Sequence, residues 1–337
     1  MEWTAPAIVL DSRPLGEGGA VVTLLTEAQG RHAGLVKGGA SRGQVATWLP
    51  GNLVEARWVA RLADQLGHLS GELVHPTAAL AMEDPLALAL LSSACAVALE
   101  ALPEREAHPA AFRALLPIVA HLQSGAAEVI PDYAQWELLL LAELGYGLDL
   151  SRCAMTGDTQ DLTHVSPRSG RAVRSDIAAP YGDRMLPLPP FLRKATLPSG
   201  PRDWSDALRL TGHFLERDAF GAHHRPVPAA RHALADRDAA VRDGFDALLD
   251  EQGITTSEFQ QQVTYQRALQ DELSATLESL EGVRTAVVHV YNAVSPAWRR
   301  IVFGMERPQI KEIAVNAAKW LRDEAAKQPD TDWRFEY

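Results

Sequence analysis

Apolar and polar positions alternate along the first part of the chain, as half-buried β-strands require. Apolar runs follow one another at 7–10, 20–26, 32–36, 53–62 and 66–75, and turn residues such as Gly30 and Gly51 separate them. Successive side chains of a strand point to opposite faces, so Arg57 and Arg61 share a face and Trp58 takes the other. Five short strands with Gly-rich turns and no helix between them predict a five-stranded β-barrel of the oligonucleotide-binding type over residues 1–77.

The apolar period changes after Pro76 to one typical of helices. Asp84 followed by Pro85 reads as a helix cap and first turn, and further helices are predicted over 109–123, 131–145 and 203–223. Residues 78–232 are therefore predicted to form an α-helical domain with a loop-rich insert at 151–203. Its apolar face is interpreted as core, with a groove for a partner peptide as the alternative.

The tail has a third pattern. A helical apolar stripe runs from Phe259 to Leu280, an apolar strand follows at 286–290, and a helix opened by Pro308 precedes a second strand at 333–337. These patterns predict a helical segment over 233–284 and one partial βαβ unit over 285–337, which makes an α/β tail. The whole chain is thus predicted to be multidomain.

Composition places the chain among globular proteins. It has 337 residues, 47% of them hydrophobic and 22% charged. No apolar run of about 18 residues occurs, so no membrane span is expected. Residues 1–4 lack the cationic region of a secretory signal, and a cytoplasmic protein is expected. Two cysteines, Cys95 and Cys153, build neither a disulfide framework nor a zinc site, and no metal or cofactor is predicted.

Charge is distributed unevenly around a net value of −11. Residues 1–62 carry six Lys or Arg against five Asp or Glu, whereas residues 63–151 carry two against twelve. A phosphate backbone responds to local charge within about 10 Å, so the N-terminal region is the candidate for binding DNA. The predicted phosphate contacts are Arg13, Arg31, Lys37, Arg42, Arg57 and Arg61. A weaker second basic patch is predicted at Arg168, Arg171 and Arg174.

Two alternatives stay open for these side chains. The cations could be ordinary solvated charges on strand edges. Trp48 and Trp58 are candidates for stacking on bases, although the alternation favours a core position for Trp58. No nucleophile–base pair, paired-carboxylate site or phosphate-cradling loop is visible, so the chain is predicted not to be an enzyme.

Five separated blocks resemble the RecO family of recombination mediators over about residues 5–232. They are GEGGAVVTLLTEAQGRHAGLVKGGASR, PGNLVEARWVARL, ELLLLAELGYGLDLSRCAMTG, VSPRSGRAV and HHRPVPAAR. The resemblance implies binding of single- and double-stranded DNA, annealing of complementary strands, and help in loading recombinase during gap repair. It implies RecR and the acidic tail of single-strand binding protein as partners. Many members carry a four-cysteine zinc ribbon that begins where Cys153 stands alone here, so no metal is expected.

The tail resembles two other families. Residues of about 235–284 resemble the ring-building motif of the flagellar MS-ring protein, which implies a helix–strand unit in a small assembly domain. Residues of about 280–337 resemble an internal piece of 2-isopropylmalate synthase. The aspartate and His-x-His metal blocks of that synthase are absent, so no synthase activity is expected. Three resemblances in series lead to the hypothesis of a chimera or artificial sequence. The alternative functions are a scaffold that assembles through its tail, and an acyltransferase fragment of the synthase kind.

Overall fold

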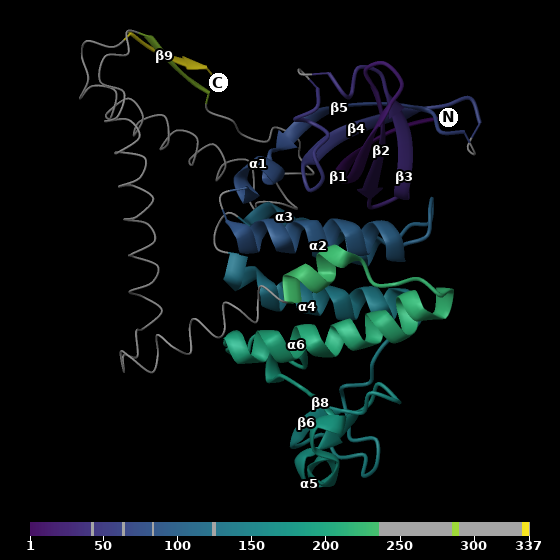
Figure 1. The fold of residues 1–337 in the computed structure, drawn as a ribbon, viewed down its shortest axis with the longest axis vertical. Coiled ribbons are helices and arrows are strands. Elements are labelled where there is room, and N and C mark those ends of the chain that lie inside the picture. Colours follow the sequence, from purple (N-terminus) through teal and green to yellow (C-terminus); the bar gives the residue numbers. More distant parts are fainter. Residues whose placement is uncertain are drawn as a thin grey trace. The chain divides into compact units, whose positions relative to one another are not determined.

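The computed structural model describes residues 1–41, 44–62, 65–82, 84–122 and 126–235, and the two strands 285–289 and 332–336. The chain divides into two compact units, Met1–Asp246 and Ala247–Tyr337. Each unit is described by itself below (Figure 1).

The first unit begins with a closed five-stranded barrel. Its strands are β1 (Glu2–Leu15), β2 (Gly19–Thr26), β3 (Gly30–Val36), β4 (Leu53–Val59) and β5 (His68–His75). They pair in the order β1-β2-β3-β5-β4, and β1 is long enough to pair with both β2 and β4. The remaining seam joins β3 to β5 in parallel through one registered pair, Leu35 with His68. The five strands confirm the predicted barrel.

Apolar side chains from every strand fill the barrel. Val22, Val54 and Ala56 are fully buried, and the rings of Trp48 and Trp58 are 1% and 2% exposed. Trp58 donates its indole N–H to the Leu66 carbonyl at 2.9 Å, which satisfies its polar atom inside the core. The alternation of buried and exposed residues along β4 and β5 therefore sets which side chains reach the outer face.

Helices follow the barrel as predicted. They are α1 (Thr77–Ala81), α2 (Pro85–Ala101), α3 (Pro109–His121), α4 (Ala126–Glu143) and α6 (Pro201–Phe214), the last continued by the π-helical segment η4 (Leu215–Phe220). Figure 1 shows α2, α3, α4 and α6 packed side by side. The Asp84 side chain accepts the Leu86 N–H at 2.8 Å, which confirms the predicted cap. Helix α4 begins five residues earlier than predicted, with Pro131 inside it.

The insert at 151–203 contains more regular structure than the sequence predicts. A three-stranded sheet in the order β7-β6-β8 joins β6 (Leu162–Val165), β7 (Ala172–Arg174) and β8 (Leu186–Pro187), and the short helix α5 (Ser175–Ala178) follows β7. The sequence does not single out these strands because strands of two to four residues are too short to show an alternating pattern. Their stability comes from packing of Val165, Ala172 and Leu186 into a shared core.

Side chains from both sides join the barrel to the helices. Arg31 of β3 donates its Nε–H to the Leu102 carbonyl at 2.8 Å, and Arg113 of α3 pairs with Glu27 at 2.8 Å. Asn52 accepts the Ala78 N–H at 3.0 Å with its side-chain oxygen. The barrel therefore does not stand apart from the helical domain, and one end of its outer surface is covered.

A buried ion pair joins α4, α6 and the segment that follows them. Arg231 contacts Glu137 through two hydrogen bonds, Nε to Oε1 at 2.5 Å and Nη2 to Oε2 at 3.0 Å. The Thr211 hydroxyl donates to Glu137 at 2.5 Å, and Arg231 also donates to the Leu208 carbonyl at 2.7 Å. Glu137 and Arg231 are 0% and 3% exposed. Such a pair is stable only when its partners satisfy both charges, as they do here.

The second unit is described through two strands. β9 (Thr285–His289) and β10 (Asp332–Glu336) pair in parallel, Thr285 with Asp332. They lie within one residue of the two strands that the sequence predicts in this tail. The helices predicted at 259–280 and after Pro308 lie outside the described residues. None of the helices described in either unit combines the length and apolarity that crossing a membrane requires.

Candidate nucleic-acid interface

The outer face of the barrel carries a row of residues that are registered with one another from strand to strand. Strand register places these residues side by side around the barrel, and we call them the outer belt: Arg13, Val21, Leu35, His68, Val59 and Glu2. The charged and imidazole groups are exposed, whereas the three aliphatic residues between them are half-buried. This face therefore combines polar side chains with aliphatic surface, a mixture that suits a chain carrying both phosphates and stackable bases.

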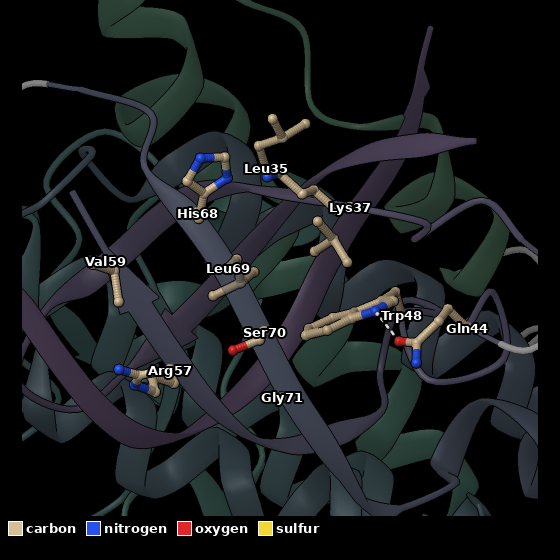
Figure 2. A pocket seen from close by; sticks show the side chains of 11 residues that line it. Leu35, Lys37, Gln44, Trp48, Arg57, Val59, His68, Leu69, Ser70 and Gly71 are labelled. Carbon is tan, nitrogen blue, oxygen red and sulfur yellow. Dashed lines mark hydrogen bonds between the residues drawn. The ribbon is translucent and has the colours of Figure 1, made fainter. Parts of the chain in front are cut away.

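A groove crosses this face over β5. It has a volume of about 420 Å³, and we call it the seam groove because it lies where β3 ends beside β5. Figure 2 shows the Ser70 and Gly71 segment of β5 with Arg57 on one side and Gln44 and Trp48 on the other. Its lining residues are Leu35, Val36, Lys37, Gln44, Trp48, Arg57, Val59, His68, Leu69, Ser70 and Gly71.

Two of the predicted phosphate contacts meet at the seam groove. Arg57 is registered opposite Ser70, and Lys37 directly follows the last residue of β3. Arg57 is exposed and pairs with Glu2 at 2.6 Å. An exposed ion pair contributes only about 0–1 kcal/mol, so a phosphate could replace the carboxylate at little cost. The structure therefore brings Lys37 and Arg57 together around one hollow.

The other barrel cations are placed separately. Arg13 is exposed on β1 and pairs with Asp11 at 2.6 Å, and Arg61 is exposed just after β4. Arg42 lies outside the described residues. Neither Arg13 nor Arg61 lines the seam groove, but both lie on exposed parts of the barrel.

Arg31 has a different environment from the other candidates. It occupies the same face of β3 as Leu35, at the end of the strand that the helical domain covers. Its guanidinium is bonded to the Leu102 carbonyl, and burial, opposed by nearby Glu104, lowers its pKa. These contacts give Arg31 a role in joining the two parts of the first unit, and they set it apart from the cations at the groove.

The second basic patch is largely neutralised by neighbouring carboxylates. Arg171 lies 3.6 Å from Asp149, and Arg174 contacts Asp158 at 2.6 Å and Asp176 at 3.1 Å. Arg168 is exposed in the turn between β6 and β7. The net positive charge of this patch is therefore smaller than its sequence indicates.

The aromatic candidates for stacking are in the barrel core. Trp48 and Trp58 are too deeply buried to stack on a base in this conformation. The exposed ring in the groove belongs to His68, which the sequence reasoning did not single out. Strand alternation could have identified His68 from the sequence. His68 and Ser70 lie on the outer face of β5, and Leu69 between them faces inward.

A buried histidine lies inside the barrel. His32 is 6% exposed and sits with its ring centroid 5.3 Å from that of Trp3 and 4.7 Å from that of Trp58. Within the described part of the chain, neither ring nitrogen has a hydrogen-bond partner. Burial, followed by the charge of Arg105, lowers the pKa of His32, while Glu104 opposes the shift. The imidazole is therefore neutral in the folded protein near neutral pH.

This environment predicts a pH-dependent contribution to stability. Below the ordinary histidine pKa of about 6.5, the unfolded chain binds a proton at His32 that the folded chain resists, so the free energy of unfolding falls as pH falls. His32→Leu removes this contribution. Urea denaturation at about pH 7.5 and about pH 5.5 should show a smaller pH difference for the variant than for the wild type. His75, whose pKa burial also lowers, is present in both proteins and cancels. Equal pH differences in the two proteins would contradict the assignment.

Among the residues that the structure describes, no group of three or more His, Cys, Asp or Glu side chains could hold a metal ion. Cys153 is buried in the turn where the zinc ribbon would begin. Burial alone would raise its pKa, but the backbone N–H groups of Thr156 and Met155 bring the pKa of Cys153 down to about 7.

Comparisons with known proteins agree with this architecture. Residues 1–77 match the family model described as "Recombination protein O N terminal", and residues 82–225 match "Recombination protein O C terminal". The chain is 57% identical over 244 residues to "DNA repair protein RecO" of Granulibacter bethesdensis, an overlap of 72% of this chain and 98% of that protein. The chain belongs to the RecO family. Proteins of the same name from Gluconacetobacter diazotrophicus and Acidiphilium cryptum are 51% and 52% identical over 253 and 249 residues, covering 72% and 73% of this chain and 98% and 99% of those proteins.

The tail matches a different family model. Residues 247–300 match "Secretory protein of YscJ/FliF RBM domain", which agrees with the predicted resemblance to a ring-building motif. About 72% of this chain covers almost the full length of the RecO relatives, and the two RecO family models lie within the first unit. The resemblance of the last residues to 2-isopropylmalate synthase stays a prediction.

Proposed function

We infer that this chain acts in DNA repair as a recombination mediator that binds DNA on the outer face of its barrel. The observation that carries this inference is the seam groove of a RecO-family barrel, with Lys37 and Arg57 on its two sides. Two cations separated by a hollow offer phosphate contacts at the edges and room for a base between them. Arg13 and Arg61 extend the same surface.

The mediator role requires binding without covalent chemistry. Annealing requires that two strands be held with their phosphate charges neutralised while the bases pair, and exposed arginine and lysine side chains provide this. We therefore propose that the chain anneals complementary strands and assists recombinase loading, and that it is not an enzyme. RecR and the C-terminal tail of single-strand binding protein are the proposed protein partners, and the cytoplasm is the proposed compartment. These details rest on family membership.

A salt titration of the full chain with a labelled single-stranded oligonucleotide tests the proposal. Neutralising phosphates releases counterions, so the logarithm of the binding constant should fall linearly with the logarithm of salt concentration. A slope of about −2 to −3 is expected if three or four cations contact phosphates, at about −0.7 per contact. Absence of binding at low salt would rule out this function.

A second candidate function comes from the tail. The match of residues 247–300 to a ring-building domain favours a scaffold that assembles through its tail, attached to a DNA-binding unit. The parallel pairing of β9 with β10 fits the proposed βαβ unit of the synthase-like piece, which by itself cannot close a parallel barrel. Sedimentation of the full chain distinguishes the possibilities, because a monomer at high protein concentration would argue against assembly.

A further inference from the structure

We propose that the seam groove receives one unpaired base of single-stranded DNA, with the flanking phosphates at Lys37 and Arg57. This inference rests on the proposed DNA-binding function and deepens it by naming the form of DNA that the site selects.

The shape follows from the way β5 extends past β3. Leu35 pairs with His68, but the next outward residue of β5, Ser70, lies beyond the end of β3. Ser70 has a small side chain and Gly71 has none, so the surface is low there. A Cβ added to Gly71 would lie 3.0 Å from the Trp48 ring, which shows how closely this backbone packs on the core. The resulting hollow of about 420 Å³ falls within the usual size range of small-ligand pockets.

The lining has the groups that a base requires. His68 supplies an exposed ring for stacking, and the half-buried side chains of Leu35 and Val59 supply apolar surface beside it. Gln44 accepts a hydrogen bond from Trp48 at 3.4 Å, which orients its amide at the side of the groove. The amide of Gln44 and the hydroxyl of Ser70 are then positioned to bond polar atoms on the edge of a base.

Cations on either side of the groove are placed to bind the phosphates that flank the base. Arg57 is exposed on β4 at one side of Ser70, and Lys37 is exposed at the other side. A base in a duplex is stacked and paired, so delivering it to this groove costs unstacking energy that a single strand does not spend. The groove therefore favours single strands, whereas the surrounding cations bind phosphates of either form.

The experiment compares two oligomers of equal length and equal phosphate number. One is a labelled thymidine oligomer, and the other is an abasic oligomer in which every base is missing. The full-length protein should bind the thymidine oligomer about tenfold more tightly, the effect expected for one stacked base. Ser70→Leu fills the groove from the outer face of β5 and should reduce this preference to less than about twofold.

Thr4→Leu is the matched control. Thr4 lies on the other side of Arg57, registered with it on β1, is exposed, and does not line the groove. It adds a side chain of the same kind without changing charge, so the preference for thymidine should remain. Should Ser70→Leu fail to fold by circular dichroism, His68→Ala removes the exposed ring and should lower the preference severalfold.

Three results would overturn the inference in different ways. Equal binding of both oligomers by the wild type, with the expected salt dependence, would rule out the base site. The proposed DNA-binding function would still stand. A thymidine preference that survives in folded Ser70→Leu would place the base contact elsewhere. Failure of either oligomer to bind at low salt would reject the DNA-binding function itself.

Discussion

Replacing Arg231 with alanine is expected to lower the free energy of unfolding by about 3–5 kcal/mol. The substitution leaves the Glu137 carboxylate fully buried without its bidentate cationic partner, with neutral hydroxyl groups such as that of Thr211 left to bond it. It also leaves the Leu208 carbonyl without the donor that Arg231 provides. Urea denaturation followed by circular dichroism measures the loss.

The double variant Glu137→Leu/Arg231→Met is the control for this prediction. It removes both charges together and fills the site with apolar atoms, so most of the lost stability should return. The expected order of stability is wild type close to the double variant, and both well above Arg231→Ala. A double variant as unstable as the single one would mean that the pair contributes through packing, and that the isolated charge has little effect.

Replacing Arg13, Lys37, Arg57 and Arg61 together with glutamine is expected to abolish most single-strand binding and flatten its salt dependence. Each phosphate contact contributes about 0.7 to the slope for a single strand, so the four together should remove nearly 3. All four side chains are exposed on the barrel, so folding should be preserved. The measurement is fluorescence anisotropy of a labelled oligonucleotide over a series of salt concentrations.

Two comparisons make this prediction specific. Glutamine at Arg168, Arg171 and Arg174 removes three positive charges from the small sheet, but two of these are already paired with carboxylates, so the slope should change little. Arg31→Gln should lower stability and leave the slope nearly unchanged, because that guanidinium bonds the Leu102 carbonyl. A slope unaffected by the four barrel substitutions would exclude this face as the DNA site.

The sequence predicted the barrel because period-two alternation is a local property of each strand. It underestimated β1, for which 7–10 was predicted and Glu2–Leu15 is observed. The ends of β1 mix polar residues with prolines and are partly exposed, and their pairing with β4 and β2 is visible only when distant strands meet. The small sheet in the insert was missed for the same reason, since its strands are defined by long-range packing.

The candidate site shows the same division between local and distant effects. Charge and alternation selected Lys37 and Arg57, and the structure places both at one groove. The same rule selected Arg31, which the docked helical domain engages. The sequence also predicts Trp48 as a stacking residue because it is aromatic, although the fold buries that ring. It does not indicate His68, whose ring is exposed in the groove.

The sequence by itself determined the order of barrel, helices and tail, the family of the first unit, and the outward face of Arg57. These are set by periodicity, turn residues and block similarity, all of which lie within short stretches. Only the tertiary structure decided which cations gather at the seam groove, which one joins the barrel to the helices, and that Arg231 meets Glu137 in the core. These outcomes depend on where β3 ends beside β5 and on how helices pack, which are properties of residues far apart in the chain.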